Sequence, residues 1–319
     1  MLTIVDGRGA ARPLSAVADE TGLWIDLLRA TPDEVSAVES ATRTNLPSAD
    51  DREAIEPSSR LIRDDDALYL TATVVAGLGE GVPRVTPITF VLTARRLITV
   101  RDQEPRAFAN FRERLAAKHR ALDAPLLFVA LIDALSDRLA DELEAVARDV
   151  QAVSDGLFRR DDSMTQTDGA ALQAAIVTTG RLQDRLTKAR ESASSLERLL
   201  SFFLGFDQLR ENVDVRHQAE SVRADLHGLA ENAAYQSSTV QFLLDAALGL
   251  ISVEQNNVME IVSVVSVVFI PPTLFASIWG MNFARMPELQ EPWGYTMALI
   301  MIALSAVLPY LFFKWKRWL

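Results

Sequence analysis

Residues 255–283 read QNNVMEIVSVVSVVFIPPTLFASIWGMNF and form an unusually long apolar segment near the end of the sequence. From Ile261 to Met281 it carries no formal charge, and about 20 such residues are enough for a helix to cross about 30 Å of hydrocarbon. Small polar side chains interrupt the apolar run. At about 100° per residue they fall on one helix face. That face holds Asp245, Ser252, Asn256, Met259, Ser263, Ser266, Ile270, Thr273 and Ser277.

This polar face has two interpretations. Lipid offers no hydrogen-bond partner, so a polar stripe is expected to face water or partner helices. Alternatively, each hydroxyl bonds to its own backbone or joins neighbouring helices. The continuity of the stripe favours the first interpretation. Pro271 and Pro272 weaken the angular argument beyond them, since proline removes backbone donors and kinks a helix.

A second apolar span follows, WGYTMALIMIALSAVLPYLFF from Trp293 to Phe313. Behind it stand Lys314, Lys316 and Arg317, which the positive-inside tendency places in the cytoplasm. Two spans then put both chain ends in the cytoplasm. The connecting loop faces outward and carries the acids Glu288 and Glu291.

The remainder of the chain is soluble in character. Residues 251–319 hold four acids and four bases, so residues 1–250 carry the whole net charge of −11. There is no cysteine, which excludes disulfides and thiolate metal sites. Asp6 and Arg8 interrupt any secretory signal at the start. No nucleic-acid partner is expected.

The predicted fold is an α+β cytoplasmic domain, with a mixed sheet and flanking helices, joined to a very long stalk helix and two C-terminal transmembrane helices. The predicted segments are a cytoplasmic α/β domain at 1–104, a stalk region at 105–250, the end of the stalk helix with the first span at 251–282, a loop at 283–292, the second span at 293–313 and a basic tail at 314–319.

Local signals place the elements. Strands are expected at 23–28, 67–76, 85–93 and 97–100. Helices are expected at 105–119 and 123–158. After a charged, polar break at 159–169, a further helix is expected to extend to about residue 206. Thr31 as N-cap, with Pro32 behind it and acids in the first turn, predicts a further helix. A short helix is expected after Ser48.

The helix from about Glu211 has the clearest periodicity. Apolar positions recur in steps of four and three, which is a heptad seam, and nothing breaks it before the membrane. Extended to Trp279, this helix is about 100 Å long. The seam comprises Val215, Ala219, Val222, Leu226, Leu229, Ala233, Gln236, Val240, Leu243, Ala247 and Leu250.

Other motifs receive plain structural interpretations. Residues 77–81, GLGEG, lack the Lys-Ser/Thr of a phosphate loop and are interpreted as a hairpin turn. Residues 63–66, RDDD, form a charged turn rather than a cation site. The three histidines, His119, His217 and His227, are interpreted as packing or surface residues. The sequence has no nucleophile elbow, HExxH or paired glycine fingerprint, so an enzyme is not expected.

Two spans per chain cannot enclose a pore, so conduction requires several copies around an axis. Copies would stack Asn256, Thr273, Ser277 and Asp245 into rings. Neutral oxygen rings suit a strongly hydrated cation such as Mg²⁺.

At Gly280-Met281-Asn282 the chain resembles the CorA family of divalent-cation channels, whose hallmark is a Gly-Met-Asn tripeptide at the end of the first of two spans. The resemblance extends to residues 271–273 (PPT), 286–289 (MPEL) and the terminal KWKRWL at 314–319. Upstream, residues 24–27 (WIDL) and 63–66 (RDDD) are similar to the family's cytoplasmic domain.

The resemblance implies a funnel-shaped homopentamer in the cell (inner) membrane. It implies potential-driven influx of Mg²⁺, and of Co²⁺ and Ni²⁺, with closure by cytoplasmic Mg²⁺ as regulatory ligand and no cofactor. It makes Gly280, Met281 and Asn282 the outer selecting mouth, with Asn282, Asn256, Thr273 and Asp245 as metal contacts. Met259, Val262 and Ile270 would be hydrophobic constrictions. Lys314, Lys316 and Arg317 match a basic collar.

The sequence departs from the family at Trp279, where Tyr is usual, and at Ala284 and Arg285, where many members carry an acid. The alternative within this superfamily is a ZntB-like proton-coupled Zn²⁺ transporter; Met281 and MPEL favour the Mg²⁺ branch. A membrane-anchored coiled-coil scaffold accounts for the heptads and spans but not for the polar stripe.

Overall fold

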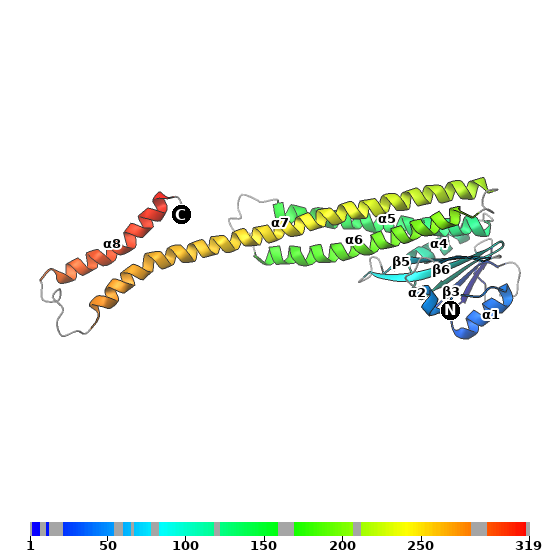
Figure 1. Cartoon of the computed structure of the whole chain (residues 1–319), viewed down its shortest axis with the longest axis horizontal. Coiled ribbons are helices and arrows are strands. Elements are labelled where there is room, and N and C mark those ends of the chain that lie inside the picture. The colour runs from blue at the N-terminus through cyan, green and yellow to red at the C-terminus, as the bar shows by residue number, and fades with distance from the viewer. Residues whose placement is uncertain are drawn as a thin grey trace. The chain divides into compact units, whose positions relative to one another are not determined.

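A computed structural model describes residues 2–6, 11–12, 22–53, 60–64, 67–77, 83–117, 122–158, 169–206, 212–281 and 292–316 (Figure 1). The chain forms two compact units. The first comprises Met1–Ser163 and Gln173–Leu244, and the second comprises Met164–Leu172 and Asp245–Leu319.

The first unit contains a mixed sheet of seven strands in the order β2-β1-β3-β7-β6-β5-β4. Its β3–β7 pair is parallel, and every other neighbouring pair is antiparallel. The predicted mixed sheet is thus confirmed, but β1, β2 and β4 were not foreseen. The strands are β1 Leu2–Asp6, β2 Ala11–Arg12, β3 Gly22–Leu28, β4 Leu61–Arg63, β5 Ala67–Ala76, β6 Arg84–Thr93 and β7 Leu97–Arg101.

Local capping begins the first helix as predicted. Helix α1 (Pro32–Thr42) starts with Pro32 behind Thr31, whose hydroxyl oxygen accepts from the Glu34 N–H at 3.3 Å. The Glu34 carboxylate accepts in return from the Thr31 N–H at 2.9 Å, which completes a capping box. The expected short helix is α2 (Ala49–Glu53).

The two sharp turns were also foreseen in part. The Asp64 N–H donates to the Ala67 carbonyl at 3.0 Å, so the charged turn joins the antiparallel strands β4 and β5. Gly77 has a φ of 79°, a left-handed value that favours glycine, at the end of β5. Residues 65–66 and 78–82 lie outside the described part of the chain.

Both faces of the sheet are covered. On one face β5 and β6 pack against α4 (Arg106–Ala117) and α5 (Ala124–Phe158) around Phe90, Phe128 and Phe203. The Phe90 and Phe128 ring centroids are 5.5 Å apart and those of Phe128 and Phe203 are 4.9 Å apart. On the other face Val38 of α1 packs with Ile25 and Leu27 of β3.

Helices α5, α6 (Gly169–Leu204) and α7 (Val213–Trp279) run side by side in the first unit (Figure 1). The heptad seam of α7 is their shared core. Nearly all its members are buried, from Val215 at 1% exposed to Ala247 at 0%, whereas Leu229 and Leu250 are partly exposed. The predicted seam is confirmed, and so is the predicted long helix, which begins at Val213 and has 67 residues.

Polar contacts fix the register of these three helices. Arg185 of α6 donates to Glu142 and Asp149 of α5, each at 2.7 Å. Gln236, an interruption of the apolar seam, donates to the Leu143 carbonyl of α5 at 3.3 Å. Because all three bonds end on α5, a slide of α5 past α6 and α7 would break them together.

A buried ion pair ties the sheet to α4. The Asp26 carboxylate of β3 accepts from the Arg101 guanidinium of β7 through Nε at 2.9 Å and Nη2 at 2.7 Å. Both side chains are essentially inaccessible, at 1% and 0% exposed. Thr99 also donates to Asp26 at 2.7 Å, and Arg112 of α4 reaches it at 3.3 Å. Removal of either Asp26 or Arg101 would leave the other charge buried without its partner.

We therefore expect Asp26→Ala to lower the free energy of unfolding by about 3–5 kcal/mol, because Arg101 would remain buried without its carboxylate. Urea unfolding of the purified chain, followed by circular dichroism, measures this loss. The control is Glu220→Ala, which breaks an exposed pair with Arg216 at 3.0 Å and should cost less than about 1 kcal/mol. Equal losses in both variants would contradict the role given to Asp26.

The second unit contains the end of α7 and helix α8 (Gly294–Trp315). Both helices are long and apolar enough to cross a membrane. Helix α7 ends at Trp279, three residues before the predicted end of the first span at 282. Helix α8 begins one residue after the start of the second predicted span, 293–313, and ends two residues beyond it.

Candidate functional site

The candidate site is the polar face of α7 beyond the helical bundle. Helix α7 continues through Pro271 and Pro272 to Trp279, so the helical spacing that aligns the face is kept. From residue 248 to 279 no residue is buried in the single chain. Every face of this part of α7 is therefore open to lipid, to water or to another chain.

The hydroxyls of the face bond to their own helix. Ser263 donates to the Met259 carbonyl, Ser266 to the Val262 carbonyl and Thr273 to the Phe269 carbonyl, each at 2.7 Å. Ser252 does the same to Leu248 at 3.0 Å. This is the local bonding of the alternative interpretation.

Such bonding does not remove the hydroxyls from ion chemistry. A hydroxyl has one hydrogen and two lone pairs, and the backbone carbonyl uses only the hydrogen. Each of these oxygens is thus fixed as an acceptor. A fixed row of acceptor oxygens suits a cation or the hydrogens of its bound water.

The two prolines add backbone oxygens to this region, which the sequence analysis did not foresee. In an α-helix the N–H of residue i donates to the carbonyl of residue i−4. Pro271 and Pro272 have no N–H, so the carbonyls of Val267 and Val268 lack that donor. At about 100° per residue Val267 lies about 20° beyond Asn256, at the edge of the polar face. The adjacent Pro271 and Pro272 are the sequence feature from which these unpaired carbonyls could have been predicted.

Three large apolar side chains interrupt the row of oxygens. Met259 and Ile270 are each 63% exposed and Val262 is 54% exposed in the single chain. Met259 and Ile270 share the arc of the serines, and Val262 lies at its border. Where copies of α7 face one another, these positions would narrow the space between them.

The predicted mouth begins where α7 ends. The Gly280 N–H donates to the Ala276 carbonyl at 2.9 Å, and a Cβ at this position would lie 3.1 Å from the same oxygen. Only glycine fits this last turn without a shift. Met281 follows, 48% exposed. Asn282, Glu288 and Glu291 lie outside the described residues.

The structure describes some of the residues predicted for the basic collar and for the pore lining. Lys314 and Lys316 stand exposed at the end of α8, with the Lys316 ammonium 5.6 Å from the Phe312 ring centroid. Arg317 lies outside the described residues. Asp245, Asn256 and Ser277 are exposed on α7.

Within the described part of a single chain, the side chains do not assemble a metal site. Among the described residues no group of three or more histidine, aspartate or glutamate side chains could hold a metal ion. The face brings its polar groups into a line along one helix rather than around a point. A cation could be surrounded only by several copies of this face.

Comparison with known proteins points in one direction. A family model described as "CorA-like Mg2+ transporter protein" matches residues 19–317. The chain is similar to the magnesium transport protein CorA of Pasteurella multocida, with 33% identity over 94% of this chain and 92% of that protein. It is similar to the Escherichia coli protein of the same name, with 34% identity over 93% and 92% of the two chains.

Solved structures share the fold. The CorA magnesium transporter from Methanocaldococcus jannaschii matches 100% of this chain and 99% of its own with a TM-score of 0.77 at 16% identity. The ZntB cytoplasmic domain from Vibrio parahaemolyticus matches 72% of this chain and 87% of its own with a TM-score of 0.55 at 17% identity.

Proposed function

The chain belongs to the family of CorA-like Mg²⁺ transporter proteins, and from this premise we propose that it conducts Mg²⁺ through a membrane pore formed by several copies of α7. The observation that carries the proposal is the row of acceptor oxygens on one face of a helix long and apolar enough to span a membrane. Mg²⁺ releases its waters reluctantly. Neutral oxygens can hold it through those waters.

The pore requires oligomerisation, and we propose a homopentamer. Its lining would comprise the polar face from Asp245 to Ser277, and its outer mouth Gly280, Met281 and Asn282. Met259, Val262 and Ile270 would form apolar constrictions, which gate by excluding water. Glu288 and Glu291 would lie in the outer loop, and Lys314, Lys316 and Arg317 would surround the inner end.

The driving force is the membrane potential. Two positive charges that move inward through 100 mV gain about 4.6 kcal/mol. We propose the cell's inner membrane as the location, with both chain ends in the cytoplasm. Co²⁺ and Ni²⁺ are proposed as further substrates, and cytoplasmic Mg²⁺ bound between subunits as the closing ligand.

The first test is uptake into proteoliposomes that contain a Mg²⁺-sensitive dye, with the potential negative inside. We expect Mg²⁺ entry that follows the potential, ignores a proton gradient and falls at least about tenfold, or about 1.4 kcal/mol, in Asn282→Ala. Zn²⁺ entry that follows the proton gradient would instead assign the ZntB-like activity. A folded oligomer that passes neither ion would leave the scaffold interpretation.

The second test asks whether the polar face lines the path. Asn256 and Asn257 are adjacent, chemically identical and both exposed in the single chain, but they point about 100° apart on the helix. Asn256→Ala should change Mg²⁺ flux by about tenfold, about 1.4 kcal/mol, and Asn257→Ala should leave it near wild type. The reverse order would place another face of α7 toward the ion.

The third test addresses the acceptor oxygens directly. Thr273→Val keeps the shape of the side chain and removes its oxygen, whereas Thr273→Ser keeps the oxygen and its bond to the helix. We expect reduced Mg²⁺ flux in the valine variant and nearly normal flux in the serine variant. Oligomer size, measured by gel filtration in detergent, should be the same in both. Equal flux in the two variants would show that the Thr273 oxygen takes no part.

A further inference from the structure

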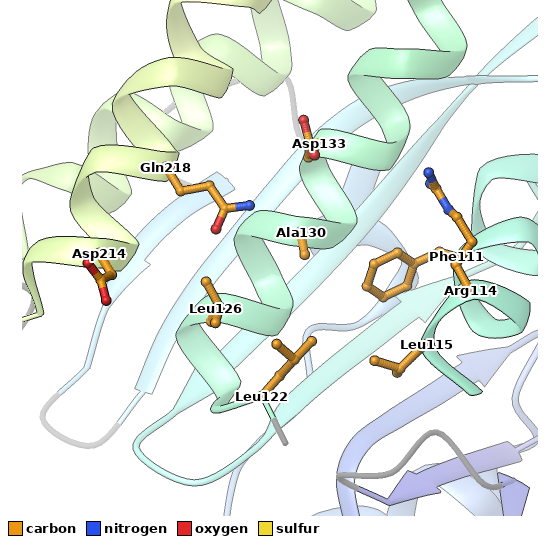
Figure 2. A pocket seen from close by; sticks show the side chains of 9 residues that line it. All are labelled: Phe111, Arg114, Leu115, Leu122, Leu126, Ala130, Asp133, Asp214 and Gln218. Atoms are coloured by element: carbon orange, nitrogen blue, oxygen red, sulfur yellow. The ribbon is translucent and has the colours of Figure 1, made fainter. Parts of the chain in front are cut away.

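A cavity of about 340 Å³ opens between α4, α5 and α7 in the first unit (Figure 2). It lies in the soluble bundle, and all its lining residues precede Asp245, where the second unit begins. Phe111 and Leu115 of α4 and Leu126 of α5 give it apolar walls. Its polar lining comes from Asp133 of α5, Asp214 and Gln218 of α7 and Arg114 of α4.

Three of the four polar side chains that line the cavity have no hydrogen-bond or ion-pair partner in the described part of the chain. Among the described residues, neither Asp133 nor Asp214 makes a hydrogen bond or an ion pair, and Gln218 makes no hydrogen bond. Figure 2 shows the Gln218 amide directed from α7 toward α5. Arg114, the cation of the cavity, is paired with Asp137 at 3.6 Å instead.

The surroundings of Asp133 favour a bound cation. Its carboxyl group is half-buried, and this burial raises its pKa above the usual range. Asp137 and Asp225 act in the same direction, while Arg114 opposes them. An unpartnered carboxylate near two further acids would be stabilised by a positive charge placed beside it.

The walls decide which kind of cation fits. A hydrated metal ion needs oxygen ligands around its whole water shell. Asp133, Asp214 and Gln218 supply oxygens to one part of that shell, but the apolar walls at Phe111, Leu115 and Leu126 leave the rest of it without ligands. An anion would meet two carboxylates, and a neutral apolar molecule would bury them without partners. A hydrocarbon chain with an ammonium group at each end satisfies both the walls and the acids.

We propose that this cavity binds an aliphatic diamine or polyamine. One ammonium group lies at Asp133 of α5 and the other at Asp214 of α7, and Gln218 accepts a further N–H through its amide oxygen. The methylene chain packs on Phe111, Leu115 and Leu126. A ligand of this kind bridges α5 and α7.

The test is isothermal titration calorimetry of the full chain in detergent, with 1,5-diaminopentane and pentylamine as probes. The two probes share a five-carbon chain but differ in the number of ammonium groups. We expect the diamine to bind at least about tenfold more tightly, because it makes one more charge-assisted contact. Equal affinities, or no binding of either probe at millimolar concentration, would overturn the proposal.

Three variants separate the contacts. Asp133→Asn should weaken both amines at least about tenfold, whereas Asp214→Asn should weaken the diamine and leave pentylamine unchanged. The control Glu144→Gln removes an exposed acid of α5 outside the cavity and should change neither affinity by more than about twofold. Equal losses in Glu144→Gln and Asp133→Asn would show only general attraction to an acidic surface.

The Asp133 variant is expected to fold. Because burial raises the pKa of Asp133, its charged form is disfavoured in the folded chain at neutral pH relative to the unfolded chain. A neutral amide should therefore leave the melting temperature unchanged or raise it. Binding is measured without ion flux, so its outcome is independent of the transport experiments.

Discussion

A helix of 67 residues, such as α7, must be held by neighbouring elements along its length. An isolated helix of this size, about 100 Å long, has no tertiary contact to fix it. The heptad seam of α7 provides that contact through the first unit, with Leu226, Val240 and Leu243 almost fully buried. The seam ends near Leu250, and beyond it the same helix exposes every face. One continuous backbone thus serves two environments.

Polar side chains of α7 bond differently in the helical bundle and beyond it. In the bundle, polar groups pair across helices, as Arg185 does with Glu142 and Gln236 with the Leu143 carbonyl. Beyond it, Ser263, Ser266 and Thr273 turn back to their own helix. A hydroxyl that bonds locally needs no partner to be folded, yet its oxygen stays available. The two interpretations of the polar face are therefore compatible, which the sequence alone did not indicate.

Features governed by neighbours in the sequence were predictable. The capping box at Thr31, the heptad seam and the two apolar spans each depend on residues a few positions apart. Contacts between distant residues were not. The pairing of β1 with β3 and the parallel β3–β7 pair need the folded sheet. The Asp26–Arg101 pair joins residues 75 positions apart, and no local pattern indicates that these two residues meet.

The proline pair has a mechanical consequence. Each backbone hydrogen bond that a proline removes would otherwise resist bending between successive turns. Helix α7 therefore bends more easily around Val267 and Val268 than in the bundle. The segment before Pro271 and the nine residues from Pro271 to Trp279 can change their mutual tilt at low energetic cost. If the part of α7 that packs in the bundle rotates, the change in tilt at the prolines displaces residues 271–279 sideways.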